Sequence, residues 1–514
     1  MRPTALILAA LAAPVAAQAP ELPADFDAYV AGVMADHEVP GLAIAVVQDG
    51  RVILAKGYGV RALGANDRVD AHTLFGIASN TKAFTATALA LLVEEGKLGW
   101  EDPVIEHLPW FRLSDAWVTS QLTIRDLLVH RSGLGLGAGD LLWWPSSTYT
   151  RREVAERLRF LPLVTSFRSA YAYDNVLYTV AGEVIEAVSG MPWEAFVQQR
   201  ILDPVGMTDS RIRHPGIMGT PNISGTHARV EGTVRAITPF TSDNTNPAGG
   251  ITASATDMAK WLQVQLDSGR VAGATRLFRP TTTRELWRIV TPQPEVVAPP
   301  LLAPLATPIR GYALGFEVRL YRGQQVVTHT GGLPGFISRV AMLPGKRLGI
   351  AVMTNMESPA MEPITWRIVD HVLGANHDWR SAYATLAKVQ ADQIAAARRG
   401  ASAARDSTAG PALPLASYAG AYRDAWYGGI DIAAEPSGLV IRFGHTPSLV
   451  GDLVPWQYET FLVRWRDREL RADAFITFTL DPTGKVAEAR MAPASPDVDF
   501  SYDFQDLRLV PVRR

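Results

Sequence analysis

The sequence predicts a mixed α/β part with an added all-helical region, followed by a small all-β part. Three observations predict this order. Strand-like stretches stand at both ends of a long helical middle section, an Ala-rich helix and a proline-bearing segment follow it, and the final stretch alternates polar and apolar residues in short runs. Because strand candidates far apart in the chain flank the same helices, we expect them to join in one sheet.

The first part opens on a predicted β-hairpin. Residues 42–47 and 52–55 are apolar runs, and the Asp49-Gly50 dipeptide between them is typical of a tight hairpin turn. Helical patterns follow over residues 79–96, 122–130, 151–160, 176–189, 192–202 and 255–268. Later strands are predicted over 326–330 and 338–343, joined by a glycine-rich turn at 331–335, and over 349–355.

The second part begins with an amphipathic helix predicted over residues 379–398. Small, polar and proline residues from 399 onward are typical of a linker. Beyond the linker, alternating segments at 429–432, 439–443, 460–465, 475–480 and 487–491 predict a small β-barrel or sandwich. We therefore expect a mixed α/β domain at 25–375, a helix and linker at 376–411, and a β-domain at 412–514.

The composition excludes several classes of partner. The 514 residues carry a formal net charge of -2 and are 47% hydrophobic, which gives no basic stripe for nucleic acid. The chain has no cysteine, so disulfides, thiolate metal sites and a cysteine nucleophile are excluded. We expect a small-molecule or peptide substrate, and the oligomeric state stays open.

The N-terminus has the pattern of a secretory signal. A charged start, an apolar run from Ala5 to Val15 and small residues after it predict a signal peptide at 1–17, cleaved after Ala17. The run is short for a membrane span and no other long uncharged apolar run follows, so we expect no stable membrane insertion; an uncleaved anchor is the alternative. An exported chain without disulfides fits a bacterial periplasm or the exterior.

A Ser-x-x-Lys pair stands at the start of the helix predicted from residue 79. Ser79 and Lys82 are three residues apart, so they share one helix face and the lysine can reach the serine hydroxyl. A serine needs a neighbouring base to become a nucleophile, and a lysine can serve only if its pKa is depressed. On its own such a short motif is more often ordinary surface helix, and the assignment depends on partners elsewhere.

Two further segments supply those partners. Tyr173 and Asn175 precede the helix predicted at 176–189; we expect a nearby lysine to lower the Tyr173 pKa, and Asn175 to bond both Lys82 and a substrate. Simple packing and helix capping are the alternative. His329 ends a predicted strand beside glycines, where it would offer a donor at the pocket edge, while Gly332 would offer a bare N–H; a structural histidine is the alternative.

In this order, Ser79-x-x-Lys82, Tyr173-x-Asn175 and His329-Thr330-Gly331 resemble the serine β-lactamase and penicillin-binding-protein superfamily, in its class C-like branch. Supporting segments are Leu127-Leu-Val-His-Arg-Ser-Gly-Leu134, Asn246-Pro-Ala-Gly-Gly250 and Met353-Thr-Asn355. The resemblance implies a β-lactamase-like α/β transpeptidase fold, with an antiparallel sheet and an all-helical lobe. The last hundred residues, more weakly, look like the lipocalin-like barrel found on some members.

The resemblance also implies a mechanism. Ser79 would form an acyl-enzyme, Lys82 and Tyr173 would carry protons, and the N–H groups of Ser79 and Gly332 would form the oxyanion hole, with no metal or organic cofactor. His329 stands where lactamase members carry a lysine, so efficient β-lactam turnover is not expected. Members with histidine there tend to be esterases, D-aminopeptidases and hydrolases of D-residue peptides, including linearised cyclic toxins of the microcystin kind.

The leading prediction is an exported serine hydrolase that cleaves amide bonds of short or linear peptides. Alternatives are a carboxylesterase, a weak β-lactamase or DD-carboxypeptidase on the same site, and a non-catalytic module that binds cell-wall fragments. Thr330 and Gly331 are expected to lie along the substrate. Aromatic residues Trp143, Trp144 and Tyr149 are candidates for a pocket wall, with packing of the helical lobe as the alternative, and Arg339 is the arginine nearest the predicted site.

Overall fold

The computed structural model of the chain describes residues 21–212, 221–271 and 275–512. The expected signal peptide at residues 1–17 lies outside the described residues.

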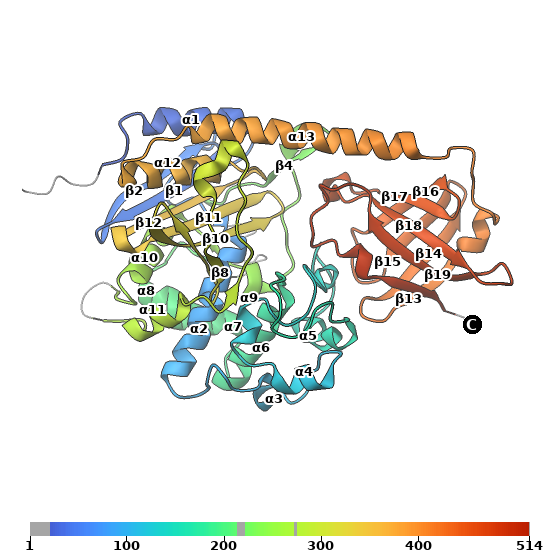
Figure 1. Ribbon diagram of the computed structural model, residues 1–514, viewed down its shortest axis with the longest axis horizontal. Helices are drawn as coiled ribbons and strands as arrows, with labels where there is room; N and C mark the ends of the chain where they lie inside the picture. Colours follow the sequence, from blue (N-terminus) through green and yellow to red (C-terminus); the bar gives the residue numbers. More distant parts are fainter. Residues whose placement is uncertain (1–20, 213–220, 272–274, 513–514) are drawn as a thin grey trace, which may run out of the picture.

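A single antiparallel sheet forms the centre of the first domain (Figure 1). Its strand order is β2-β1-β12-β11-β10-β9-β8-β7. The strands are β1 (Gly41–Gln48), β2 (Arg51–Gly59), β7 (Thr291–Pro292), β8 (Arg310–Tyr312), β9 (Glu317–Tyr321), β10 (Gln324–Leu333), β11 (Phe336–Leu343) and β12 (Leu348–Thr354). β1 pairs with β12, with Leu42 opposite Thr354, so the predicted union of strands from both ends of the domain is confirmed.

The turn between β1 and β2 is the predicted hairpin. Asp49 has a φ of 51° and Gly50 a φ of 75°, the left-handed pair that a two-residue turn between twisted strands requires.

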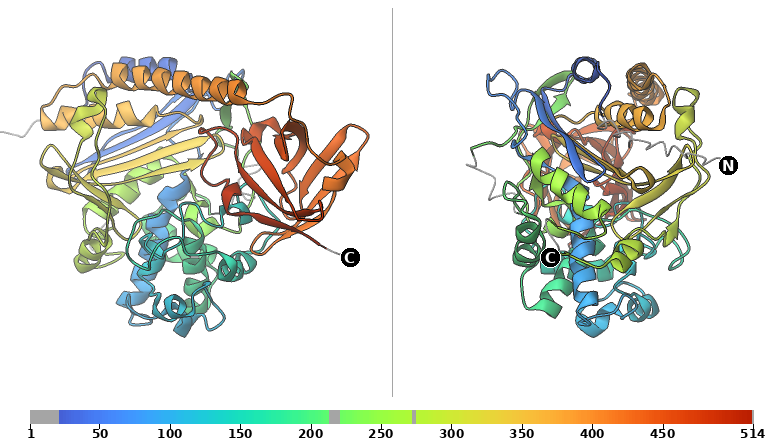
Figure 2. Two further views of the ribbon diagram at one scale, coloured as in Figure 1. Left: turned by 45° about the vertical axis from the view of Figure 1, so that its right-hand side comes forward. Right: turned by 90° about the vertical axis from the view of Figure 1, so that its left-hand side faces the viewer.

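Helices cover both faces of this sheet, as Figure 2 shows from two sides. Alternate residues of β1 point to opposite faces. Ile44 packs with α1 (Phe26–Asp36), α12 (Met361–Leu373) and the start of α13 (Trp379–Ala404), while Ala45 packs with α2 (Lys82–Glu94) and α10 (Ala255–Leu266). The ring of Phe84 on α2 stacks on Trp261 of α10 with centroids 3.9 Å apart. Because both faces are buried, β1 and β12 are apolar almost throughout.

The helical lobe lies below the sheet in Figure 1. It contains α3 (Val104–His107), α4 (Ala116–Gln121), α5 (Arg151–Arg157), α6 (Val176–Ser189), α7 (Trp193–Val197) and α8 (Asp203–Val205). The short strand β3 (Phe75–Gly76) precedes α2 and pairs with β6 (Thr252–Ala253). Between the lobe and the late strands come β4 (His227–Val230), β5 (Thr233–Ala236), α9 (Asn246–Gly249), β6 and α11 (Pro280–Leu286). The predicted helices at 151–160, 176–189 and 255–268 are confirmed, and that at 192–202 continues past α7 as a wider turn over Gln198–Leu202.

The helix predicted over residues 122–130 is wrong. Only one 3₁₀ turn forms there, Asp126–Leu128. The carboxylate of Asp126 accepts hydrogen bonds from the backbone N–H of Thr123 (3.1 Å) and from Nε of Arg131 (2.8 Å). Such local side-chain bonds compete with helix formation, and His130, with a φ of 56°, turns the chain away.

Helix α13 leads from the sheet toward the C-terminal domain and ends at Ala404. Residues 399–404, which we expected in the linker, therefore continue the helix, because the alanine-rich sequence favours it. No helix within the described ranges is long and apolar enough to cross a membrane.

The C-terminal domain is a closed antiparallel β-barrel. Its strands are β13 (Gly420–Asp424), β14 (Gly428–Glu435), β15 (Gly438–Phe443), β16 (Val450–Gln457), β17 (Thr460–Trp465), β18 (Ala474–Leu480), β19 (Val486–Pro493) and β20 (Arg508–Pro511). The sequence pattern indicated β14, β15, β17, β18 and β19 and missed the others. β16 carries a register shift at Pro455, and β20 is short, so neither shows clear alternation.

The barrel packs against the helical lobe. The backbone N–H of Thr148 donates to the carbonyl of His445 (2.8 Å), and Arg157 Nη1 donates to the carbonyl of Trp426 (2.8 Å). The ring of Tyr149 stacks on His445 with centroids 3.9 Å apart, and its hydroxyl donates to the Tyr427 carbonyl. Tyr149, a candidate for the pocket wall, therefore belongs to the contact between the two domains.

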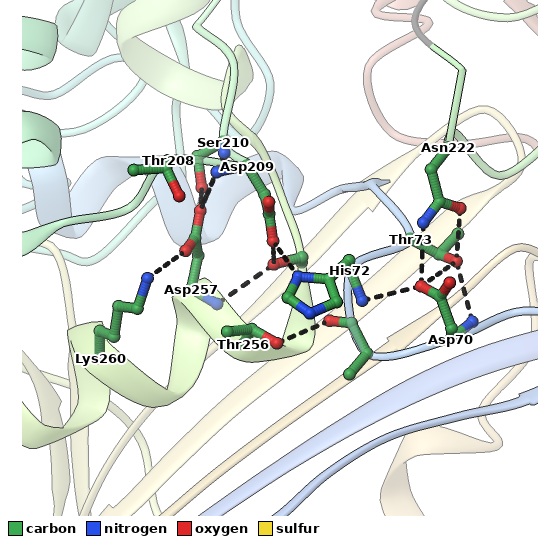
Figure 3. Close-up of polar contacts among 12 residues, drawn as sticks. Asp70, His72, Thr73, Thr208, Asp209, Ser210, Asn222, Thr256, Asp257 and Lys260 are labelled. Atoms are coloured by element: carbon green, nitrogen blue, oxygen red, sulfur yellow. Dashed lines mark hydrogen bonds and ion pairs between the residues drawn. The ribbon is translucent and has the colours of Figure 1, made fainter.

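A polar cluster fixes the start of α10 (Figure 3). The buried carboxylate of Asp257 accepts from the backbone N–H groups of Asp209 (2.8 Å) and Ser210 (2.9 Å) and from Lys260 Nζ (3.0 Å). Ser254 caps α10 by accepting from the Asp257 N–H. Its hydroxyl donates to Asp209 (2.7 Å), which also lies 2.9 Å from His72. Ser254 and His72 both contact the carboxylate of Asp209 and do not contact each other. They do not form a nucleophile and base pair, so we interpret the cluster as structural.

We predict that Asp257→Ala lowers the free energy of unfolding by about 3 kcal/mol, because it leaves buried N–H groups without acceptors. Thr256→Ala, which removes one hydroxyl bond to the Ala71 carbonyl in the same turn of α10, is the matched control and should cost less than about 1 kcal/mol. Urea unfolding followed by circular dichroism measures both. Equal losses in the two variants would contradict this account of the cluster.

Candidate active site

A cavity of about 460 Å³ opens between the end of β10, the turn before α2 and the loop before α6. Residues expected from the sequence line it: Ser79, Trp143, Trp144, Tyr173, Asn175, His329, Thr330, Gly332 and Arg339. Lys82 lies beneath Ser79, fully buried. The structure therefore brings together predicted residues that are up to 260 positions apart in the chain, from Ser79 to Arg339.

Ser79 lies on a 3₁₀ turn, Ala78–Thr81, that leads directly into α2. Asn80 Nδ2 donates to the hydroxyl of Ser338 on β11 (2.8 Å), and this hydroxyl donates to the carbonyl of Ile77 (2.8 Å). Ala78 has a φ of 48°, an unusual backbone conformation for a residue with a side chain. The turn is thus tied to the sheet on one side and to α2 on the other, which fixes the position of the Ser79 hydroxyl.

Gly331 allows β10 to approach this turn. A Cβ atom at residue 331 would lie 2.3 Å from the Ile77 carbonyl oxygen and 2.6 Å from Ser338 Oγ, far inside contact distance. At Gly332 the nearest atom to a Cβ would be 3.4 Å away. Gly331 is therefore required for packing, whereas Gly332 lines the cavity.

Lys82 Nζ makes three short polar contacts. It lies 3.0 Å from Ser79 Oγ, 2.7 Å from Asn175 Oδ1 and 3.0 Å from the carbonyl oxygen of Ala248 on α9. A carbonyl oxygen only accepts, so Asn175 and Ala248 each take one N–H of the amine. A neutral amine has two N–H groups, and its remaining lone pair then points to the Ser79 hydroxyl.

The orientation of the Asn175 amide is set by Asp140. Asn175 Nδ2 donates to Asp140 Oδ2 (2.9 Å), so the carbonyl end of the amide must face Lys82. Asp140 is buried and also accepts from Trp143 Nε1 (2.8 Å). Asp140 therefore orients the Asn175 side chain so that its oxygen, and not its NH₂ group, faces Lys82.

Burial lowers the pKa of Lys82 to about 7. The charges of Asp140 and Asp174 act in the opposite direction, since they favour the ammonium form. Burial also raises the pKa of Asp140 to about 7, and hydrogen bonds from Trp143 and Asn175 partly offset that rise. The Lys82 charge in turn favours the Asp140 carboxylate, so each group stabilises the charged form of the other.

Tyr173 behaves differently from our expectation. Lys82 Nζ lies 4.9 Å from the centre of its ring, yet the pKa of Tyr173 is raised well above its usual value. Burial is the main cause, and a hydrogen bond with Ser79 only partly opposes it. The prediction of a lowered Tyr173 pKa is wrong because burial of the phenol disfavours its charged form. Tyr173 is therefore a protonated hydroxyl in contact with Ser79.

His329 is a neutral, buried imidazole. Its Nδ1 lies 2.5 Å from the Thr330 carbonyl, which can only accept, so Nδ1 carries the proton. Nε2 then accepts from the hydroxyl of Tyr312 (2.7 Å). Burial, with a smaller effect from the Lys82 charge, lowers the pKa of His329 to about 3. The expectation that His329 offers a donor to the pocket is wrong, since both ring nitrogens are already occupied.

The predicted pocket walls are mostly covered. Trp143 and Trp144 border the cavity, but only 5% and 8% of their surfaces are exposed. The indole N–H of Trp143 bonds Asp140, so this residue supports the site from behind. Arg339 also borders the cavity, almost fully buried, and its guanidinium pairs with Glu362.

Several residues at the site were missed from the sequence. Asp140 carried one usable signal, a lone acidic residue between a glycine-rich run and Leu141-Leu-Trp-Trp144, where a carboxylate is liable to be buried. Tyr312 on β8 had none, because its contact with His329 forms only through the sheet. Phe500 and Ser501 of the C-terminal domain also line the cavity, and nothing local in the sequence marks them.

A serine hydroxyl beside a desolvated lysine amine, between an antiparallel sheet and a helical lobe, defines a serine hydrolase. The chain belongs to the Beta-lactamase family, because the sequence model of this family matches residues 26–374. A separate match covers residues 404–511, to a domain of unknown function called DUF3471.

Two relatives are fungal. The chain is 29% identical to unguisins hydrolase ungD of Aspergillus violaceofuscus over 440 residues, which cover 80% of this chain and 77% of that protein. It is 28% identical to unguisins hydrolase ungD' of Aspergillus campestris, over 90% of this chain and 87% of the relative. The octameric penicillin-binding protein homologue from Pyrococcus abyssi shares the fold, with a TM-score of 0.60 and 20% identity over 95% of this chain and 99% of that one.

We predict that kcat/KM toward a nitrophenyl ester rises with pH through about 7, the pKa of Lys82. Only the neutral amine has a lone pair for the Ser79 proton, so the rate should fall about tenfold for each pH unit below that value. His72→Ala removes an exposed histidine whose pKa is raised by Asp209, and it should leave the profile unchanged. A profile that is flat between pH 6 and 8 would be incompatible with Lys82 as the base.

Proposed function

We propose that this protein cleaves amide bonds of short or linear peptides through an acyl-enzyme on Ser79, and that peptides with D-residues, such as linearised cyclic toxins of the microcystin kind, are among its substrates. The observation that carries the proposal is the arrangement around Lys82, whose two N–H groups are both taken by carbonyl oxygens. In the neutral amine, the remaining lone pair can then take the proton of Ser79, whose Oγ lies 3.0 Å from Nζ.

The first step is acylation. Lys82 Nζ takes the proton of Ser79 as Oγ bonds to the substrate carbonyl carbon, and the N–H groups of Ser79 and Gly332 stabilise the oxyanion. Tyr173 then donates its hydroxyl proton to the leaving nitrogen and regains one from the Lys82 ammonium. The amine product departs, leaving Ser79 acylated and Lys82 neutral.

The second step is hydrolysis of the acyl-enzyme. A water molecule gives its proton to the neutral Lys82 amine and attacks the ester carbonyl. When the tetrahedral intermediate collapses, the proton returns to Ser79 Oγ and the acid product leaves. The same base therefore serves both halves of the reaction.

The edge of β10 supports a peptide substrate. β9 pairs with β10 only as far as Thr328, opposite Glu317. Beyond that point Thr330 and Gly332 line the cavity, so an extended peptide can add to the strand edge. A second cavity of about 320 Å³ also has Gly332 in its wall, which leaves room for a chain on either side of the scissile bond.

The charge at position 329 disfavours β-lactams. A neutral imidazole with both nitrogens bonded attracts a drug carboxylate far less than a lysine ammonium would. Exposed apolar side chains at the cavity rim, Leu136 and Phe500, favour an uncharged group there. The fungal relatives are named for the hydrolysis of unguisins, which also supports a substrate other than a β-lactam.

We also propose that the protein is exported, to a bacterial periplasm or beyond. The support is the signal-like pattern of residues 1–17. Sequencing of the mature N-terminus tests this: cleavage after Ala17 is expected, and a mature protein that starts at Met1 would contradict it.

We predict that Ser79→Ala lowers kcat/KM by about 10³-fold or more on both linear peptides and nitrophenyl esters, because no other group can form the acyl bond. Ser169→Ala, an exposed serine in the loop before Tyr173, is the matched control and should keep full activity. A fluorophosphonate probe should add to wild type and not to Ser79→Ala, as read by mass spectrometry.

The peptide part of the proposal has its own test. Wild type is incubated with a set of linear L- and D-containing peptides, a nitrophenyl ester and a penicillin. Peptide products at higher kcat/KM than the penicillin support the proposal. Fast ester turnover with every peptide intact would replace peptidase by esterase.

A further inference from the structure

A loop of the C-terminal barrel reaches the catalytic cavity. It lies between β19 and β20 and carries Asp499, Phe500, Ser501 and Asp503. The carboxylate of Asp503 accepts from the backbone N–H groups of Gly139 (2.7 Å) and Leu141 (3.0 Å). These are the neighbours of Asp140, so the barrel holds the segment that carries this residue.

The same loop contacts the catalytic residues more directly. The hydroxyl of Ser501, which is 4% exposed, donates to Asp140 Oδ2 at 2.9 Å. The ring of Phe500 meets that of Tyr173 edge to face, with centroids 6.1 Å apart.

These contacts form a chain of hydrogen bonds from the barrel to the base. Ser501 donates to Asp140, Asn175 donates to the same oxygen of Asp140, and Lys82 donates to Asn175. If Asp140 lost its character as an acceptor, the Asn175 amide could turn and present N–H to Lys82. The amine would then have to direct its lone pair at Asn175, and Ser79 would lose its base.

We propose that Ser501 is a positioning residue of the active site, so that the C-terminal barrel completes the machinery that orients the Lys82 lone pair toward Ser79. The inference rests on the proposed function of Ser79 and Lys82. The active site would then need residues of both domains, because Ser501 belongs to the barrel and Asp140, Asn175 and Lys82 belong to the first domain.

Loss of the Ser501 hydroxyl should lower the pKa of Lys82. Within the described residues, the charged or titratable groups around Asp140 and Lys82 are the carboxyls of Asp174 and Asp503, the rings of His130 and His329, and the phenols of Tyr173 and Tyr178. Loss of the Ser501 donor disfavours the Asp140 carboxylate, which raises the pKa of Asp140. Lys82 then loses a negative neighbour, and its pKa falls.

The test is Ser501→Ala in the full-length protein, with Thr446→Val as the matched control. Thr446 is a buried barrel hydroxyl that bonds Tyr427 (2.8 Å) and does not line the cavity. We expect Ser501→Ala to lower kcat about tenfold with KM nearly unchanged, since a donor to a charged group is lost. The acid limb of the kcat/KM profile should move about half a unit to lower pH. Thr446→Val should resemble wild type.

Asp140→Asn supplies a second, nearly isosteric variant in case Ser501→Ala does not fold. It removes the negative charge, so it should lower kcat further and move the acid limb in the same direction. Because Ser501 acts through Asp140, adding Ser501→Ala to Asp140→Asn should change kcat less than about twofold.

Three results would overturn the inference. One is a Ser501→Ala profile and kcat equal to wild type. Another is a shift of the acid limb to higher pH, which is what water entering a loosened site would cause by raising the Lys82 pKa. The third is a full additive loss in the Asp140→Asn background. If wild type itself fails to react with the fluorophosphonate, the proposed function fails instead, and the two failures are distinguishable.

Discussion

The structure depends on one buried amine. Lys82 is enclosed by α2, α6 and α9, and its burial is tolerated because each of its polar contacts is matched. Desolvation lowers its pKa to about 7, and the same desolvation makes it useful as a base. The surrounding elements can be understood as the means of keeping this amine dry and directed at Ser79.

The elements that enclose Lys82 are themselves fixed by hydrogen bonds. Thr85, one turn along α2, donates to the Pro247 carbonyl at 2.7 Å and so holds α9, which carries Ala248, against the helix. The Asp140 carboxylate holds Asn175 on the other side. A site assembled in this way needs both the helical lobe and the sheet, and the barrel loop reaches the same carboxylate.

Electrostatics also separates this site from one built to hold an anionic drug. The pKa of Lys82 is about 7, the imidazole of His329 is uncharged at neutral pH, and the raised pKa of Tyr173 keeps its hydroxyl protonated. Lys82 and His329 therefore supply no permanent positive charge beside the nucleophile, while the edge of β10 offers backbone groups. Arg310, Arg319 and Arg339 line the same cavity.

Much of this could be predicted from the sequence, for physical reasons. The β1–β2 hairpin, the union of early and late strands and the pair of Ser79 and Lys82 follow from local patterns: apolar runs, an Asp-Gly turn and helical spacing. The Tyr173 pKa and the donor role of His329 could not be predicted, because both depend on burial and on Tyr312, which is distant in sequence.

The prediction of a helix at 122–130 was wrong for a related reason. The Asp126 carboxylate accepts hydrogen bonds from the backbone N–H of Thr123 and from Arg131 and Arg168, and these bonds stabilise a turn and not a helix. Ser501 and Asp140 meet across two domains and 361 positions of the chain, and no local pattern reports such a contact.

The most direct test of the central claim is the titration of Lys82 itself. Nuclear magnetic resonance of the full-length protein with ¹³C-labelled lysine side chains, assigned by comparison with Lys82→Arg, reports the protonation of Nζ. We predict a Lys82 transition near pH 7. A Lys82 signal that titrates at about pH 10.4, the ordinary value of a free lysine side chain, would contradict the role of Lys82 as the base.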